Sequence, residues 1–211
     1  MIPGRLTRMR AVEPADLGLL KDIANDRFVA TMVVGWDWPL SQFGQETWWE
    51  EAHDNATTRR FIVEDHEGLA IGMTGLWDID WHNRHALTAL KLHPERVQRG
   101  MGTDAIKNLM AYAFHDVGLN RLWGAILDFN GPSFGAYVKK CGWRIEGCLR
   151  EEIFRKGAFH DLYRVAALRS DFDALPDAQE YVERLNPADT RDKVVLPPEW
   201  WAAPSPLTDP R

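Results

Sequence analysis

The order of apolar and polar residues in the first half of the chain predicts helices followed by a β-meander. Apolar residues recur at helical spacing over 17–24, directly after the turn Pro14–Asp16, and a second helix is expected after Ser41. Strand-like runs of residues lie at 5–12, 60–64, 70–77 and 86–92. The last three of these runs predict a central antiparallel meander.

Beyond residue 100 the pattern changes to an alternation of helices and strands. Residues 103–114 carry apolar side chains at helical spacing, and Gly118 can end that helix. The segments expected after it are a strand at 122–127, a helix at 133–141, and strands at 143–154 and 160–168. This order is typical of an α/β (α+β) protein with a mixed sheet.

The composition of the chain changes near residue 170. Residues 1–170 contain all the predicted strands and form the expected main domain. Residues 171–211 are expected to hold one helix over 173–185 and then an extended tail, because 187–211 is rich in proline and charge.

The bulk composition narrows the classes of function. The chain has 211 residues, a formal net charge of -6 and a pI of about 5.6, so it lacks the basic surface that binding to nucleic acid needs and favours a cationic substrate. No stretch approaches the roughly 20 apolar residues of a membrane span, and the N-terminus lacks the apolar core of a signal peptide. We therefore expect a cytoplasmic protein that binds neither nucleic acid nor membranes.

The spacing of the cysteines and the position of the tryptophans bear on a possible metal site and acceptor pocket. Cys141 and Cys148 have no CxxC spacing and no histidine at ligand spacing, so we expect two reduced, packed thiols and no metal site. Ten tryptophans are present, and six of them lie between residues 36 and 81. They can serve as core packing or as an aromatic wall around an acceptor pocket, and the sequence leaves both readings open.

A glycine-containing segment precedes the helix predicted near residue 103. Its residues are Gln98, Arg99, Gly100, Met101, Gly102 and Thr103. Glycines allow the backbone N–H groups to converge, and the positive end of the helix dipole adds to their attraction for an anion. The segment has the features of a pyrophosphate cradle, although an ordinary tight turn has the same pattern. It lacks the third glycine of a dinucleotide-binding fingerprint and the lysine of a P-loop.

A second segment strengthens the case for a phosphate-bearing cofactor. In Asn130–Trp143 an asparagine follows a predicted strand, Ser133 starts a helix, and Tyr137 lies four residues later on the same helix face. Residues 98–103 resemble the Q/R-x-x-G-x-G/A loop of the GNAT superfamily of N-acetyltransferases, and Asn130–Trp143 is similar to that superfamily's Asn-x-x-(Ser/Ala)-x-x-x-Tyr-x-Lys-x-Gly-Phe segment. The run 146–152, with Gly157 and His160–Asp161, resembles the branch of ribosomal-protein alanine and spermidine acetyltransferases.

The resemblance implies a fold, a cofactor and a set of site residues. It implies a mostly antiparallel sheet of six to seven strands with about four helices, and acetyl-CoA as co-substrate. It also implies that residues 98–103 bind the CoA pyrophosphate, that Leu90 and Leu92 pair with the pantetheine arm, and that Asn130 and Ser133 hydrogen-bond the cofactor. Tyr137 would protonate the departing thiolate. The role of Asn130 as a loop or helix cap, and of Arg99 as a solvated side chain, stays open.

The general base and the acceptor stay open as well. No carboxylate lies in 86–92, where relatives often carry one. The candidates for the acceptor side are Asp78, Asp80, His85, His93 and Glu151. Asp78 and Asp80 would share one face of an extended strand, which suits the binding of an ammonium group. The expected partner is an amine-bearing acceptor, a homodimer is the assembly that we consider, and an inactive CoA-binding sensor or regulatory module is the alternative function.

Overall fold

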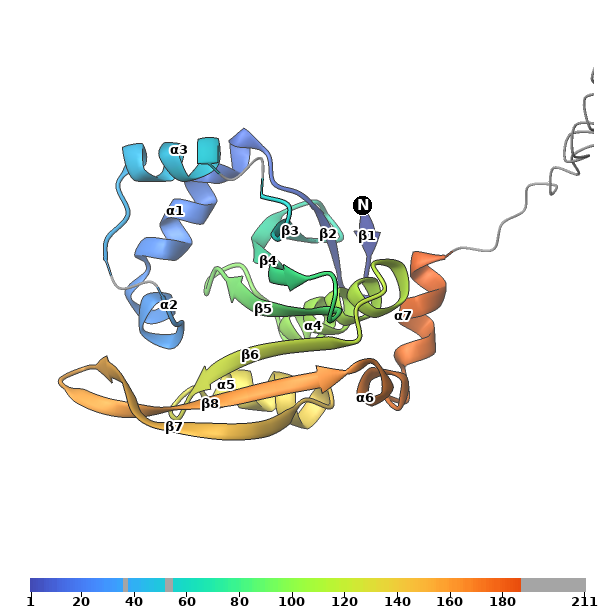
Figure 1. Cartoon of the computed structure of the whole chain (residues 1–211). Coiled ribbons are helices and arrows are strands. Elements are labelled where there is room, and N and C mark those ends of the chain that lie inside the picture. The colour runs from blue at the N-terminus through green and yellow to red at the C-terminus, as the bar shows by residue number, and fades with distance from the viewer. Residues whose placement is uncertain (36–37, 52–54, 187–211) are drawn as a thin grey trace, which may run out of the picture.

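The computed structural model describes residues 1–35, 38–51 and 55–186, and its centre is one eight-stranded sheet (Figure 1). The strand order is β1-β2-β3-β4-β5-β6-β8-β7, and every neighbouring pair is antiparallel except β5 and β6. The strands are β1 (Ile2–Pro3), β2 (Thr7–Ala11), β3 (Arg59–Asp65), β4 (Ala70–Asp80), β5 (His85–Leu92), β6 (Arg121–Leu127), β7 (Arg144–Arg155) and β8 (Ala158–Leu168).

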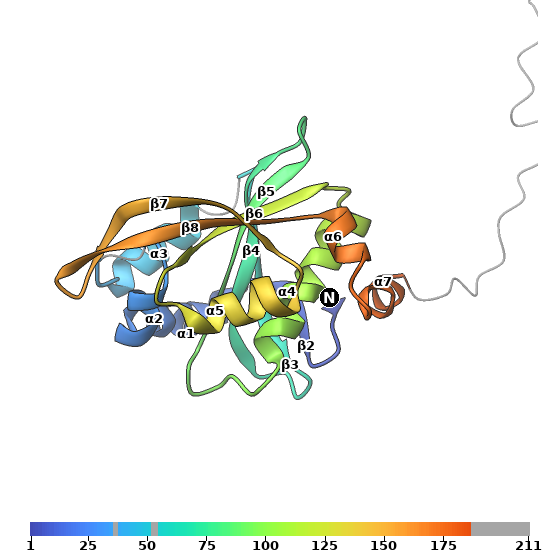
Figure 2. The same ribbon diagram turned by 90° about the horizontal axis from the view of Figure 1, so that it is seen from below.

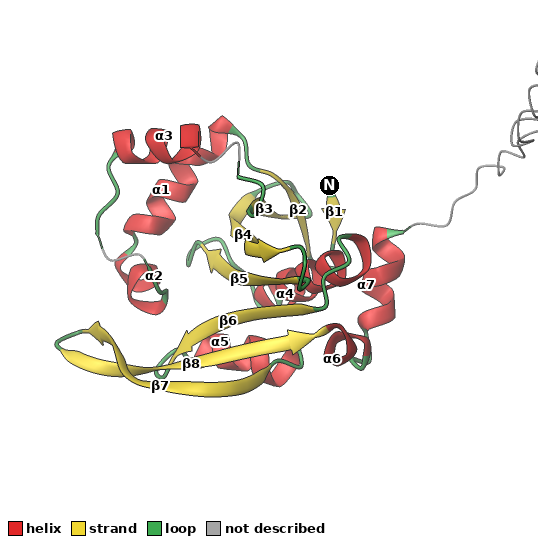
Figure 3. Cartoon of the chain, in the orientation of Figure 1, coloured by secondary structure: helices red, strands yellow, loops and turns green. Residues whose placement is uncertain are grey.

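Helices cover both faces of this sheet (Figure 3). They are α1 (Leu17–Asn25), α2 (Arg27–Met32), α3 (Gln42–Glu51), α4 (Met101–Ala111), α5 (Gly131–Ser133), α6 (Arg169–Asp173) and α7 (Ala178–Leu185). A π-helical turn extends α4 over Tyr112–Asp116, and another extends α5 over Phe134–Lys140. Figure 2 shows α4 and α5 together on one side of strands β6 and β8.

The mixed, mostly antiparallel sheet confirms the predicted fold class, and the differences have local causes. The strand count exceeds the expected six to seven because β1, only two residues long, pairs with β2. Helix α2 was not predicted; it is six residues long and starts where the Asp26 carboxylate accepts the Val29 N–H. The single helix expected over 173–185 is two helices, α6 and α7, separated by a segment that contains Pro176.

Alternation along the central strands divides the side chains between two packed layers. On one face Val63 and Leu76 join the core beneath α4, whereas on the other face Leu20 of α1 packs against Ile62 and Met73. Helix α4 is therefore separated from α1 by the sheet.

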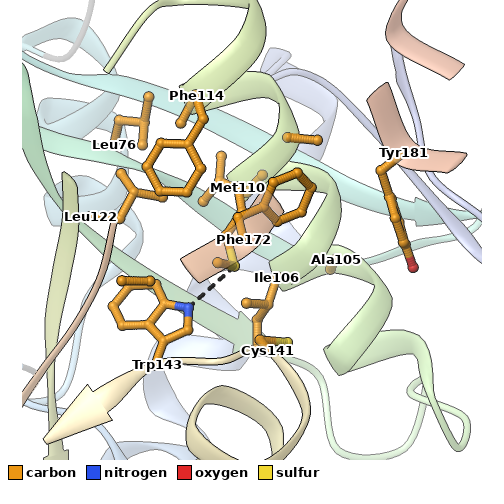
Figure 4. Close-up of a cluster of buried hydrophobic side chains, with 14 of the residues drawn as sticks. Leu76, Ala105, Ile106, Met110, Phe114, Leu122, Cys141, Trp143, Phe172 and Tyr181 are labelled. Atoms are coloured by element: carbon orange, nitrogen blue, oxygen red, sulfur yellow. Dashed lines mark hydrogen bonds between the residues drawn. The ribbon is translucent and has the colours of Figure 1, made fainter. Parts of the chain in front are cut away.

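The core beneath α4 contains large aromatic side chains from distant parts of the sequence (Figure 4). Trp143 is 2% exposed and its Nε1–H donates to Met110 Sδ at 3.2 Å. Phe114 packs against Phe172 of α6 with the ring centroids 6.1 Å apart. The core thus continues past residue 170, while the proposed division into 1–170 and 171–211 stays a prediction; residues 187–211 lie outside the described part of the chain.

A buried carboxylate fixes the start of α4. Asp104 accepts hydrogen bonds from the backbone N–H groups of Arg5, Leu6 and Thr7 at 2.8 to 3.0 Å, and from the Thr7 hydroxyl at 2.7 Å. The Tyr181 hydroxyl of α7 also donates to it at 2.7 Å. The first turn of α4 is therefore tied to both ends of the described chain.

Candidate active site

The parallel strands β5 and β6 pair over only three rungs and then separate. The pairs are His85–Arg121, Ala86–Leu122 and Leu87–Trp123, and in Figure 1 the two strands diverge from there toward α2. The His93 N–H donates to the Ile71 carbonyl, so alternate residues along β5 direct their backbone groups toward β4. Leu90 and Leu92 therefore direct theirs away from β4, into the opening. An extended ligand could pair with them there, as the sequence predicted.

A cavity of about 560 Å³ occupies the opening. Its lining comes from α2, β4, β5, β6, the start of α5, Tyr137 of the following π-helical turn, and the hairpin formed by β7 and β8. The cavity is therefore bounded by elements from both faces of the sheet.

The glycine segment forms the start of α4, next to the separated strand. Gly100 has a φ of 95°, a left-handed conformation that glycine adopts without strain. Gly102 lies in the first helical turn, where a Cβ would lie 3.5 Å from Leu92 Cδ1 and 3.9 Å from Leu90 Cδ2. The N–H groups of Gly102 and Thr103 belong to the first turn, where the helix supplies no acceptor for them. The helix starts at Met101, and the side chains of Gln98 and Arg99 are exposed; the binding of a pyrophosphate by this segment stays a prediction.

Asn130 caps α5 and also holds α2 in place. Its Oδ1 accepts the Ser133 N–H at 3.1 Å, and its Nδ2–H donates to the Met32 carbonyl at 2.9 Å. Asn130, Ser133 and Tyr137 all line the cavity, so the segment recognised in the sequence meets the separated strands at one place. The capping role of Asn130 is observed, and its contact with a cofactor stays a prediction.

Tyr137 is held against the core in a defined orientation. Its ring meets the Trp143 ring edge to face, with centroids 4.9 Å apart and planes at 84°. Burial, with the nearby Cys141 thiol as a smaller cause, raises the pKa of the Tyr137 phenol well above its ordinary value. The phenol therefore stays protonated at neutral pH. Burial likewise raises the pKa of Cys141, to about 12.

The opposite face of the sheet supplies the other wall of the cavity, and cations are prominent there. Lys91 lies beside Trp77, with its Nζ 5.5 Å from the ring centroid, and the Arg164 guanidinium lies 5.2 Å from the Trp123 centroid. Burial, with the charge of Arg60 as a second cause, lowers the pKa of Lys91 to about 8. Trp77 and Trp123 line the cavity, whereas Trp143 belongs to the core, and the aromatic wall around an acceptor pocket stays a prediction.

The candidate acceptor residues lie outside this lining. A bulge interrupts β4 between Trp77 and Asp80, and Asp78 has a φ of 50°, so the expectation that Asp78 and Asp80 share a strand face was wrong. The Asp80 carboxylate instead accepts two hydrogen bonds from Asn83. His85 belongs to the first rung of the β5–β6 pairing, away from the opening, and its Nε2 lies 3.7 Å from Asp80 Oδ2.

The remaining acceptor-side candidate, Glu151, lies in the hairpin formed by β7 and β8. Glu151 has a φ of 53° and its N–H donates to Asp161, whereas the next residue, Glu152, lines the cavity. No sequence motif pointed to Glu152, Lys91 or Arg164 as lining residues. Lys91 lies between Leu90 and Leu92 in β5, so alternation along the strand could have indicated that its side chain lies on the opposite face of the sheet.

The sequence also predicted two reduced, packed thiols and no metal site. Within 1–35, 38–51 and 55–186 no cluster of histidine, cysteine and carboxylate side chains could hold a metal ion. Cys141 is buried, but Cys148 is exposed, so the expectation of two packed thiols was wrong for Cys148 because both faces of β7 are open there. In the same ranges, every helix is too short or too polar to cross a membrane.

Comparison with known proteins identifies this arrangement. Residues 6–144 match the family model of the acetyltransferase (GNAT) domain. A spermidine N(1)-acetyltransferase of Vibrio cholerae is 30% identical over 78% of this chain and 94% of its own, and one of Escherichia coli K12 is 26% identical over 78% and 87%. The Vibrio cholerae spermidine N-acetyltransferase in complex with CoA and spermine superposes with a TM-score of 0.71 at 29% identity, covering 79% of this chain and 97% of that one. The chain belongs to the GNAT acetyltransferase family and is an acyl-CoA-dependent N-acetyltransferase.

Proposed function

We propose that this protein transfers an acetyl group from acetyl-CoA to a primary amine, on a small molecule or a protein N-terminus, by direct attack in a ternary complex. The observation that carries the proposal is the opening between β5 and β6, where the glycine loop of α4 and the Asn130 segment meet one cavity. Because the cavity is bounded from both faces of the sheet, cofactor and acceptor can occupy it together. A protein of this kind would act in the cytoplasm, as a homodimer.

The cofactor side has the groups that acetyl-CoA needs. The first-turn amides of α4 would bind the pyrophosphate, with Gly102 leaving room for it, and the exposed Arg99 would add charge. The free backbone groups of Leu90 and Leu92 would pair with the amides of the pantetheine arm. Asn130 and Ser133 would complete the polar contacts.

The chemical step needs three proton movements. The acceptor ammonium first loses a proton to water, and the neutral nitrogen attacks the thioester carbonyl. The N–C bond forms and the C–S bond breaks, so the electron pair leaves with the CoA sulfur, and the nitrogen releases its second proton to water as the amide forms. Tyr137, which lines the cavity, would donate its proton to the sulfur and then take up one from solvent. The products are an N-acetyl amine and free CoA.

The test is amine-dependent release of the CoA thiol from acetyl-CoA, followed by mass analysis of the amine. A gain of one acetyl group on the amine, with stoichiometric thiol release, supports the proposal. CoA binding without amine-dependent release would instead establish the inactive, CoA-binding alternative.

A further inference from the structure

The acceptor side of the cavity carries more cationic than anionic side chains. Among the described lining residues, Lys91 and Arg164 are the cations and Glu152 is the carboxylate. The remaining lining on this side is apolar or aromatic, from α2, Trp77 and Trp123. A ligand here therefore meets two cations, one anion and a hydrophobic surface.

The two cations lie on opposite walls of the opening. From the last paired rung, Leu87–Trp123, Lys91 is four residues further along β5. Arg164 is paired with Ala125, two residues further along β6. Both side chains lie on the sheet face opposite α4, since Lys91 contacts Trp77 and Arg164 contacts Trp123. A group bound between the strands on that face would have a cation on each side.

The charged form of Lys91 is disfavoured in the folded protein. It is largely withdrawn from water, and Arg60, which stacks on Trp48 with 5.1 Å between guanidinium and ring centroid, adds a like charge nearby. Both effects oppose its ammonium form. An ammonium group withdrawn from water at a cavity wall interacts strongly with an anionic group of a ligand that reaches it.

We propose that the acceptor is an amine that also carries an anionic group such as a carboxylate, which Lys91 and Arg164 bind while Glu152 holds the ammonium. This inference rests on the proposed acetyl transfer and names the acceptor class for the same site. A polyamine would instead place further ammonium groups against Lys91 and Arg164 with no additional carboxylate among the described lining residues. An apolar linker between amine and anion would contact the tryptophans.

The experiment compares three acceptors with the full chain: 4-(aminomethyl)benzoate, its carboxamide 4-(aminomethyl)benzamide, and spermidine. The benzoate should exceed both others in kcat/KM by about 10- to 100-fold, the range expected for a hydrogen-bonded charged contact. Lys91→Met should bring the benzoate-to-benzamide ratio close to one, and Lys91→Arg should keep most of it. Lys139→Met, at an exposed position, serves as the control and should keep the parental ratio.

The outcomes separate this inference from the proposed function. Thiol release with spermidine at least as fast as with the benzoate, or a ratio unaffected by Lys91→Met, overturns the inference and leaves acetyl transfer intact. No release with any of the three amines overturns both.

Discussion

Replacing Lys91 with methionine should stabilise the unliganded protein at neutral pH. The pKa of Lys91 is lowered from 10.5 to about 8 in the folded chain, and each pKa unit corresponds to about 1.4 kcal/mol, so its charged form costs about 3 kcal/mol of folding free energy. Methionine has a similar length, carries no charge and keeps a favourable contact with Trp77. Loss of the ammonium–indole contact offsets about 1 kcal/mol, which leaves an expected gain of about 2 kcal/mol at pH 7.

The pH dependence of that stability gain reports on the Lys91 charge more specifically than its size at pH 7 does. Between pH 8 and 10.5 the unfolded chain binds a proton at Lys91 that the folded chain has lost, so the parent becomes more stable with rising pH at this residue. The advantage of Lys91→Met should therefore fall by about 3 kcal/mol across this range. Urea unfolding of parent, Lys91→Met and the exposed control Lys139→Met at several pH values measures it. A stability difference that does not change with pH, or one equal to that of the control, would show that the charge of Lys91 does not destabilise the fold.

Three further substitutions test the site and its support. Tyr137→Phe should lower kcat by about 10² to 10⁴-fold with little change in CoA affinity. Tyr112→Phe, at a position outside the cavity lining, is the control and should leave kcat unchanged. Retention of more than roughly half the parental kcat by Tyr137→Phe would assign Tyr137 to packing. Tyr181→Phe removes a donor to the Asp104 carboxylate and should cost about 2 kcal/mol in urea unfolding, and an unchanged midpoint would exclude α7 from the cooperative unit. Gly100→Ala should cost about 1 to 2 kcal/mol at its φ of 95°, and no loss would show that the turn relaxes.

Features set by local sequence were predictable. The glycine segment before α4 and the Asn130–Tyr137 segment each carry their signal within a few residues, because a left-handed N-cap and an asparagine cap restrict the residue types that fit. The strand over 86–92 was also predicted from local sequence, whereas the pairing of Leu90 and Leu92 with the pantetheine arm came from the family resemblance and stays a prediction.

Features set by irregular backbone conformation or by tertiary packing were not predictable from the sequence. Left-handed residues at Asp78 and Glu151 break the alternation on which the acceptor-side predictions relied, so the carboxylate in the cavity is Glu152. The end of the short helix α2 is bound by Asn130, whose side chain donates to the Met32 carbonyl from 98 positions away in the sequence. No local pattern reports such a contact.

Calorimetric titration with CoA is the decisive measurement, because every proposed step depends on the cofactor binding at the start of α4. Gly102→Val places a branched side chain toward Leu92 and Leu90, where the cofactor would pass, whereas Gly18→Val fills open space in α1 and is the matched control. The parent and Gly18→Val should bind CoA with one-to-one stoichiometry, and Gly102→Val should remain folded and bind none. Equal binding by Gly102→Val, or no binding by the parent at millimolar CoA, would contradict the account.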